Sequence, residues 1–116
     1  ARLKESQSAK SPQKQMNLKQ TVISLGPLVF VPFPFEIFSE ITLRLRQDSP
    51  FQHTLSLSNA NGSYFYFPSQ RDICKGGYEI WVSKSMNVYS LADNADDAAV
   101  SENLRLLEQL STITEC

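Results

Sequence analysis

The sequence is poor in the residues on which cross-linked folds and compact binding sites are commonly built. It holds two cysteines, one histidine, one tryptophan and four glycines in 116 residues. Two cysteines cannot form a disulfide scaffold, and one of them, Cys116, is the last residue. With His53 as the only histidine, and no HxxxH or CxxC, we expect no complete metal site from this chain alone. No nucleophile elbow, phosphate-binding loop or dinucleotide fingerprint occurs either.

Long apolar runs and an excess of one charge are also missing. No run approaches the roughly 20 residues that span a bilayer, so we expect no transmembrane segment. No basic-then-apolar leader ends in small residues, so we expect no export signal in these residues. Eleven basic against twelve acidic side chains give a formal charge of −1, and we expect no nucleic-acid partner.

The near-zero charge conceals a gradient along the chain. Residues 1–20 carry five basic side chains against one acidic, and residues 93–116 carry six acidic against one basic. The first stretch is rich in Ser, Gln and Lys and has no aromatic residue for base stacking. We therefore expect residues 1–20 to be a flexible basic lead-in and residues 21–116 to form an α/β domain.

Hydrophobic patterning predicts the secondary structure of that domain. Strands are expected at residues 21–25, 28–31, 54–58, 63–67 and 78–82. Residues 36–47 fit a helical stripe and a strand-like alternation, and the charges at their two ends favour the helix. Residues 69–75 predict a short helix capped by Ser69, and a leucine-striped helix follows a cap at Asp93 or Asn94. The order βαββαβα predicts a mixed β-sheet flanked by helices.

Few residues are candidates for chemistry. Glu36 follows a double-proline strand exit, and Tyr66 lies on an aromatic strand after a turn. A carboxylate and a phenol at strand ends can bind a metal or polarise a carbonyl. On the residues alone, the simpler interpretation is a glutamate at the start of a helix and a packed aromatic sheet. His53 and Cys74 are interpreted as surface or packing residues.

Four segments taken in order resemble the neutral/alkaline (non-lysosomal) ceramidase family. Residues 25–40 resemble its hydrophobic strand and Pro-Gly-Glu element, and residues 43–51 resemble the helix and break that follow. Residues 61–69 are similar to its Asn-x-Tyr-x-x-Tyr-x-Pro-Thr stretch, and residues 76–79 to its Gly-Gly-Tyr-Glu. Three positions differ: Phe35 replaces the glycine of Pro-Gly-Glu, Ser63 replaces the first tyrosine, and Phe65 replaces the small residue before the second tyrosine.

The resemblance implies a zinc-dependent amidase that hydrolyses the amide of ceramide-type lipids. In that family two histidines, a glutamate and a tyrosine hold the zinc, and a serine nearby serves in catalysis. Glu36 and Tyr66 match the glutamate and tyrosine ligands, whereas the histidines and serine come from an upstream region. The chain thus looks like the C-terminal part of a larger α/β catalytic domain.

Several expectations follow from this resemblance. The isolated chain should be inactive and without cofactor, with zinc bound only in the complete protein. Its partners would be the remainder of its own catalytic domain and a ceramide-like lipid. The family implies a secreted, periplasmic or cell-surface location. The alternative is a non-catalytic α/β interaction or structural domain that has lost the metal site.

Overall fold

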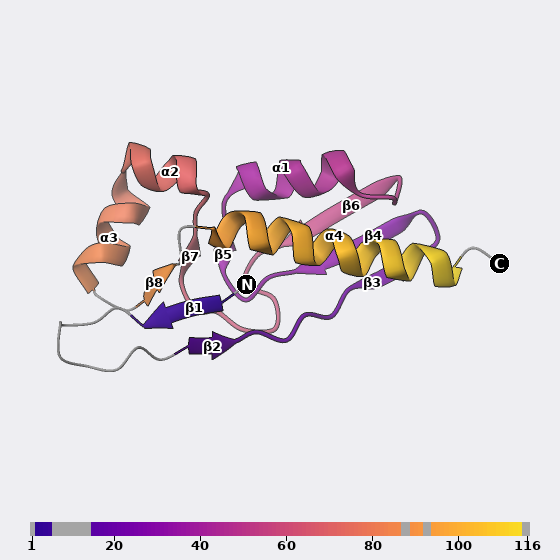
Figure 1. The fold of residues 1–116 in the computed structure, drawn as a ribbon, viewed down its shortest axis with the longest axis horizontal. Coiled ribbons are helices and arrows are strands. Elements are labelled where there is room, and N and C mark those ends of the chain that lie inside the picture. The colour runs from indigo at the N-terminus through magenta and orange to yellow at the C-terminus, as the bar shows by residue number, and fades with distance from the viewer. Residues whose placement is uncertain (1, 6–14, 87–88, 92–93, 115–116) are drawn as a thin grey trace.

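The computed structural model describes residues 2–5, 15–86, 89–91 and 94–114. The strands along these residues are β1 (Arg2–Glu5), β2 (Gln15–Asn17), β3 (Ile23–Leu25), β4 (Leu28–Pro32), β5 (Glu36–Ile37), β6 (His53–Leu57), β7 (Tyr66–Phe67) and β8 (Tyr89–Leu91). The helices are α1 (Ser39–Asp48), α2 (Gln70–Lys75), α3 (Tyr78–Met86) and α4 (Ala95–Thr114). Figure 1 shows their arrangement.

The sheet against which the core packs has the strand order β3-β4-β6. Strands β3 and β4 are antiparallel and are joined by a turn at Gly26, whose φ is 59°. Strands β4 and β6 are parallel, with Leu28 opposite His53 at one end and Pro32 opposite Leu57 at the other. A parallel pair needs a crossover connection, and α1 lies in that connection.

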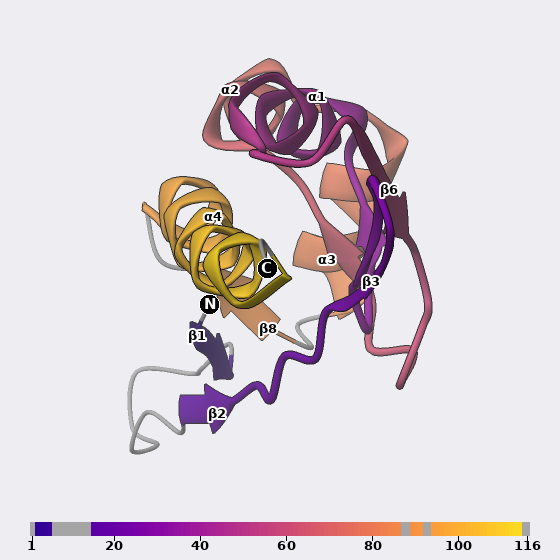
Figure 2. The same cartoon turned by 90° about the vertical axis from the view of Figure 1, so that its right-hand side faces the viewer.

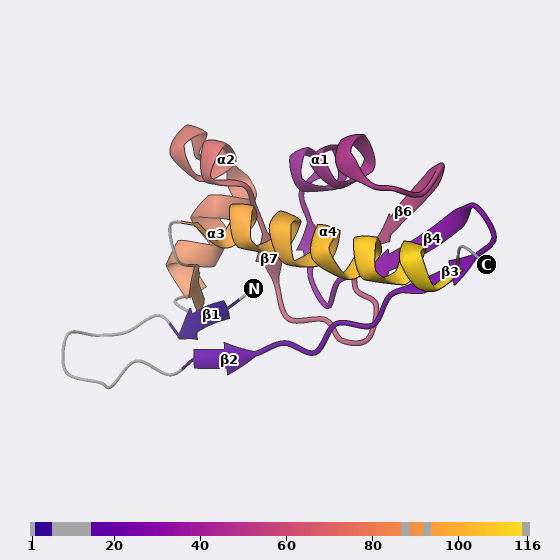
Figure 3. The same ribbon diagram turned by 45° about the vertical axis from the view of Figure 1, so that its right-hand side comes forward.

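Two smaller sheets complete the strand pairing. Strands β5 and β7 form a parallel two-stranded sheet. Strands β2, β1 and β8, in that order, form an antiparallel three-stranded sheet. Figures 1 and 3 show β1, β2 and β8 at one end of the molecule with α3, and β3 and β4 towards the other end. The predicted α/β fold, a mixed sheet with helices, is confirmed.

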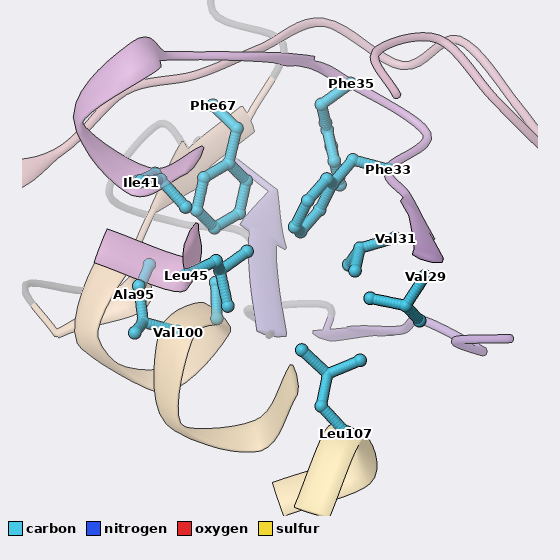
Figure 4. Packing of buried hydrophobic residues seen from close by; sticks show 11 residues of the cluster. Val29, Val31, Phe33, Phe35, Ile41, Leu45, Phe67, Ala95, Val100 and Leu107 are labelled. Carbon is cyan, nitrogen blue, oxygen red and sulfur yellow. The ribbon is translucent and has the colours of Figure 1, made fainter. Parts of the chain in front are cut away.

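Helices α1 and α4 lie on one face of the β3-β4-β6 sheet (Figure 2). The apolar run of β4 directs Val29 and Val31 into this layer, where both are buried. They pack with Ile41 and Leu45 of α1 and with residues of α4. The buried cluster comprises Val29, Val31, Phe33, Phe35, Ile41, Leu45, Phe67, Ala95, Ala99, Val100 and Leu107, most of which Figure 4 labels.

Acidic and basic side chains fix how α4 meets α1 and α2. Asp96 is buried and accepts hydrogen bonds from the backbone N–H of Gln70 at the start of α2 and of Asp97, both at 2.9 Å. Arg44 of α1 lies 3.7 Å from Asp96 and 2.7 Å from Asp97. The acidic first turn of α4 therefore ties three helices together.

The helix predicted over residues 36–47 is confirmed, but it begins at Ser39. Glu36 and Ile37 instead form β5, because they pair with Tyr66 and Phe67 of β7. The short helix predicted over residues 69–75 is also confirmed. Its cap is Ser69, whose side-chain oxygen accepts a hydrogen bond from the backbone N–H of Asp72 at 3.2 Å.

The prediction of an extended segment at residues 78–82 is wrong. These residues begin α3, and the backbone N–H of Trp81 donates to the carbonyl of Gly77 at 2.9 Å, which opens the helical ladder directly after the two glycines. The β-branched and aromatic residues of this segment have high strand propensity, which led to the wrong prediction. A strand also needs a pairing partner, and none of the described strands pairs with residues 78–82.

Other differences concern the short strands. We expected order to begin near Thr21, whereas β1 and β2 lie earlier and β1 pairs with β8. The strand predicted at residues 63–67 is limited to Tyr66 and Phe67. The division of the chain at residue 20 stays a prediction.

No helix among the described residues has the length and apolar character needed to cross a bilayer.

Candidate functional site

Glu36 and Tyr66, thirty positions apart in sequence, lie directly opposite each other in the β5–β7 pair. The backbone N–H of Glu36 donates to the carbonyl of Phe65 at 2.9 Å, and that of Phe38 donates to the carbonyl of Phe67 at 3.1 Å. Side chains alternate between the faces of a strand. Accordingly Glu36 is exposed and Tyr66 half-buried, whereas Phe67 is buried in the core.

A second set of hydrogen bonds holds the chain on the other side of Glu36. The backbone N–H of Asn59 donates to the carbonyl of Phe35 at 2.9 Å, and the backbone N–H of Ile37 donates to Oγ of Ser58 at 3.2 Å. The backbone around Glu36 is therefore hydrogen-bonded on both of its edges.

Phe35 occupies the position of the glycine in the family pattern without disturbing this arrangement. Its side chain is 2% exposed, and its ring centroid lies 5.2 Å from that of Phe67 and 5.4 Å from that of Tyr64. Figure 4 shows Phe35 and Phe67 within the core. Phe35 is not among the described residues with positive φ. A large side chain is accommodated here because it turns inward, which leaves Glu36 facing outward.

The turn before β7 depends on left-handed backbone. Asn59 and Asn61 have φ of 53° and 62°, and Gly62 has φ of 146°. A Cβ on Gly62 would lie 3.0 Å from Cβ of Pro34, so only glycine lets the turn approach so closely. The backbone N–H of Tyr64 then donates to the carbonyl of Pro34 at 2.8 Å. This contact guides the chain into β7 beside β5.

The surroundings of Tyr66 disfavour its ionised form. Partial burial is the largest cause that raises the pKa of the Tyr66 phenol, followed by the negative charge of Glu36. Tyr78 and Glu79, at the start of α3, raise this pKa further. At neutral pH the phenol is protonated and can donate a hydrogen bond. Negatively charged carboxylates lie near it.

Tyr78 and Glu79 were not predicted as site residues. From sequence they are part of a Gly-Gly-Tyr-Glu motif, in a segment predicted to be extended. Their position directly after two glycines could have indicated a role, because glycines commonly end one helix and let the chain turn into the next element. The turn from α2 into α3 brings their charges within range of Tyr66.

The other candidate residues are not members of the β5–β7 pair. His53 is exposed at the start of β6, whereas Glu36 follows the far end of the β4–β6 pair. Cys74 is an exposed residue of α2 with a free thiol. Ser63 is exposed, and its Oγ donates to Oδ1 of Asn59 at 3.2 Å. Cys116 lies outside the described residues.

The donor set of the pair suits part of a zinc site. Carboxylate oxygen is a common zinc ligand, and a phenol becomes one when it loses its proton. In the described part of the chain, no group of three or more His, Cys, Asp and Glu residues could hold a metal ion. Glu36 and Tyr66 can thus supply two oxygen ligands, and a complete site needs nitrogen or sulfur ligands from elsewhere.

Comparison of the chain with protein-family models, curated proteins and solved structures found no match. The zinc-binding roles of Glu36 and Tyr66 therefore stay predictions.

Proposed function

We propose that this chain is part of a zinc-dependent amidase that hydrolyses the N-acyl amide of ceramide-type lipids. In this proposal Glu36 and Tyr66 are two of the zinc ligands. The observation that supports it most is the register of the parallel β5–β7 pair, which sets these residues opposite each other. The resemblance selected both residues without reference to their distance in space.

The chain's own residues would perform a limited set of tasks. The Glu36 carboxylate supplies a negative charge, held in place by a backbone bonded on both edges. The Tyr66 phenol holds a proton at neutral pH and would release it when a cation binds beside it. When bound, zinc polarises an amide carbonyl and activates water.

The site also requires residues that this chain does not provide. Two oxygen ligands without imidazole make a weak zinc site, and His53 lies at the opposite end of the β4–β6 pair. We therefore propose that the remainder of the catalytic domain supplies the histidine ligands and the serine. The isolated chain should be inactive.

Amide hydrolysis by the complete protein tests this function. The substrate is an N-acylsphingosine, and the variants are Glu36→Gln and Tyr66→Phe. Matched controls are Glu102→Gln, on the exposed side of α4, and Tyr64→Phe, two positions from Tyr66 and partly exposed. We expect the two site variants to lose at least about a hundredfold in kcat/KM, because loss of a direct ligand should cost no less than the roughly 10- to 100-fold lost when a group supporting a ligand is removed. The proposal fails if the protein hydrolyses no such amide, or if the site variants match their controls.

One observation favours the alternative, a non-catalytic α/β domain. Phe35 is a buried core residue, so the segment before Glu36 contributes to stability whether or not a metal binds. In that case Glu36→Gln and Tyr66→Phe would leave the complete protein's properties unchanged.

A further inference from the structure

The turn from β6 towards β7 contains two asparagines that share a backbone conformation and differ in their surroundings. Asn59 and Asn61 are both exposed, and their φ angles are 53° and 62°. Asn59 precedes Ala60, whereas Asn61 precedes Gly62 in the one Asn-Gly pair of the sequence. The two asparagines therefore form a matched pair within a single turn.

Asn59 is restrained at its side chain and at the peptide nitrogen that follows it. Its Oδ1 accepts a hydrogen bond from Oγ of Ser63 at 3.2 Å. The backbone N–H of Ala60 donates to the carbonyl of Phe33 at 2.9 Å. The Cβ of Ala60 also stands beside that nitrogen, which a glycine would leave open.

Asn61 has neither restraint. Within the described part of the chain, no residue forms a hydrogen bond with the Asn61 side chain or with the backbone N–H of Gly62. Gly62 is exposed and has no Cβ to shield its nitrogen. A free peptide nitrogen beside a free side-chain amide supplies the two reacting groups of asparagine deamidation.

Deamidation at this position needs only water as a co-reactant. The peptide nitrogen of Gly62 bonds to Cγ of Asn61 and gives up its proton, and the side-chain nitrogen takes up a proton and leaves as ammonia. Water then opens the resulting five-membered succinimide. Its addition at Cγ gives aspartate, and its addition at the backbone carbonyl carbon gives isoaspartate. The sum consumes one water and releases one ammonia, without oxidation or reduction.

The isoaspartate product does not fit the turn as it stands. The backbone N–H of Asn59 donates to the carbonyl of Phe35 at 2.9 Å, and that of Tyr64 donates to the carbonyl of Pro34 at 2.8 Å. Isoaspartate adds one backbone atom between these two fixed points. A Cβ on Gly62 would already lie 3.0 Å from Cβ of Pro34, so the turn has little room for a longer backbone.

We propose that Asn61 is a site of spontaneous deamidation, and that its isoaspartate product destabilises the turn into β7. Asn59 is protected by its hydrogen bonds and by Ala60. The reaction requires neither zinc nor amidase activity, so its test is independent of the proposed function.

Timed incubation of the complete protein in mildly alkaline buffer, with and without urea, tests the site. Trypsin releases residues 47–71 as one peptide, because Arg46 and Arg71 are the nearest cleavage sites on either side. Both asparagines of the turn lie in this peptide, and its fragmentation in a mass spectrometer measures their conversion side by side. Asn61→Gly is the control without the amide, since glycine tolerates positive φ.

We expect Asn61 of the folded protein to convert at least about tenfold faster than Asn59, and no more than about tenfold slower than in urea, because the fold leaves its reacting groups free. The peptide of Asn61→Gly should keep its mass. A folded protein in which Asn61 is as slow as Asn59, or is slowed further relative to urea, would overturn the proposal. A glycan on Asn61 would overturn it too, because Asn-Gly-Ser is also an N-glycosylation acceptor and the glycan would occupy the amide nitrogen.

Urea unfolding of the separated isoaspartate form tests the effect on the turn. Its matched control is Asn61→Asp, which carries the same charge without the added backbone atom. We expect the isoaspartate form to unfold at a lower urea concentration than Asn61→Asp. Equal midpoints would contradict the destabilisation of the turn.

Discussion

If Tyr66 is a zinc ligand, its phenol must lose a proton when the metal binds. A tyrosine phenol is protonated at neutral pH, and burial and the neighbouring Glu36 raise the pKa of Tyr66 further. A zinc ion beside it would reverse the local electrostatics and favour the phenolate. Zinc affinity should therefore increase with pH wherever Tyr66 is a ligand.

Replacing Glu36 by Gln should lower the pKa of Tyr66, because a carboxylate that disfavours the phenolate is removed. The titration midpoint can be followed by NMR of chains labelled with ¹³C at the tyrosine ring carbon that bears the hydroxyl, with Tyr66→Phe assigning the signal. Glu102→Gln, on α4, is the control and should leave the midpoint in place. An unchanged or higher midpoint in Glu36→Gln would show that Glu36 does not face Tyr66.

Phe35 should be essential to the core although a glycine stands there in the family pattern. Phe35→Gly removes a ring that packs against Phe67 and Tyr64. We expect the free energy of unfolding to fall by at least about 3–5 kcal/mol in urea denaturation, as for other buried Phe truncations. Phe35→Leu keeps most of the volume and should cost less than about 1.5 kcal/mol. Equal losses in both variants would contradict this packing.

Among the elements, those with a strong local period were predictable from sequence. Helix α4 follows from its leucine stripe and acidic first turn, and β6 from its alternation. The start of helix α3 was wrongly predicted to be a strand, because its residues have high strand propensity. A strand needs a pairing partner, and no described strand pairs with these residues. Strands β1, β2 and β8 were missed, because each has only three or four residues and β1 pairs with a strand more than eighty positions away.

The two aspartates of α4 should differ sharply in their contribution to stability. Asp96 is buried and caps the start of α2, whereas Asp97 is an exposed partner of Arg44. Asp96→Ala leaves the backbone N–H of Gln70 without its acceptor, at an expected cost of about 1–3 kcal/mol. Asp97→Ala should cost less than about 1 kcal/mol, the usual range for an exposed ion pair. Thermal unfolding of both variants measures the difference, and equal losses would contradict the bridging role of Asp96.

At the scale of the whole molecule, the candidate site depends on pairing that no local pattern encodes. Residue type and family resemblance selected Glu36 and Tyr66, but only the β5–β7 register places them together. Tyr78 and Glu79 raise the pKa of Tyr66 from the start of α3, a segment whose sequence predicted an extended conformation. Likewise, the alternation in β6 identifies an apolar side of the strand but does not say which side meets the helices.

Zinc binding by the complete protein tests the central claim most directly. Dialysis of the metal-free protein against buffered zinc, followed by elemental analysis, gives the affinity of the wild type and of each variant. We predict about one zinc per protein in the wild type, at least tenfold weaker binding in Glu36→Gln and Tyr66→Phe, and unchanged binding in Glu102→Gln and Tyr64→Phe. A wild-type protein that binds no zinc, or site variants that bind it as tightly as their controls, would contradict the account.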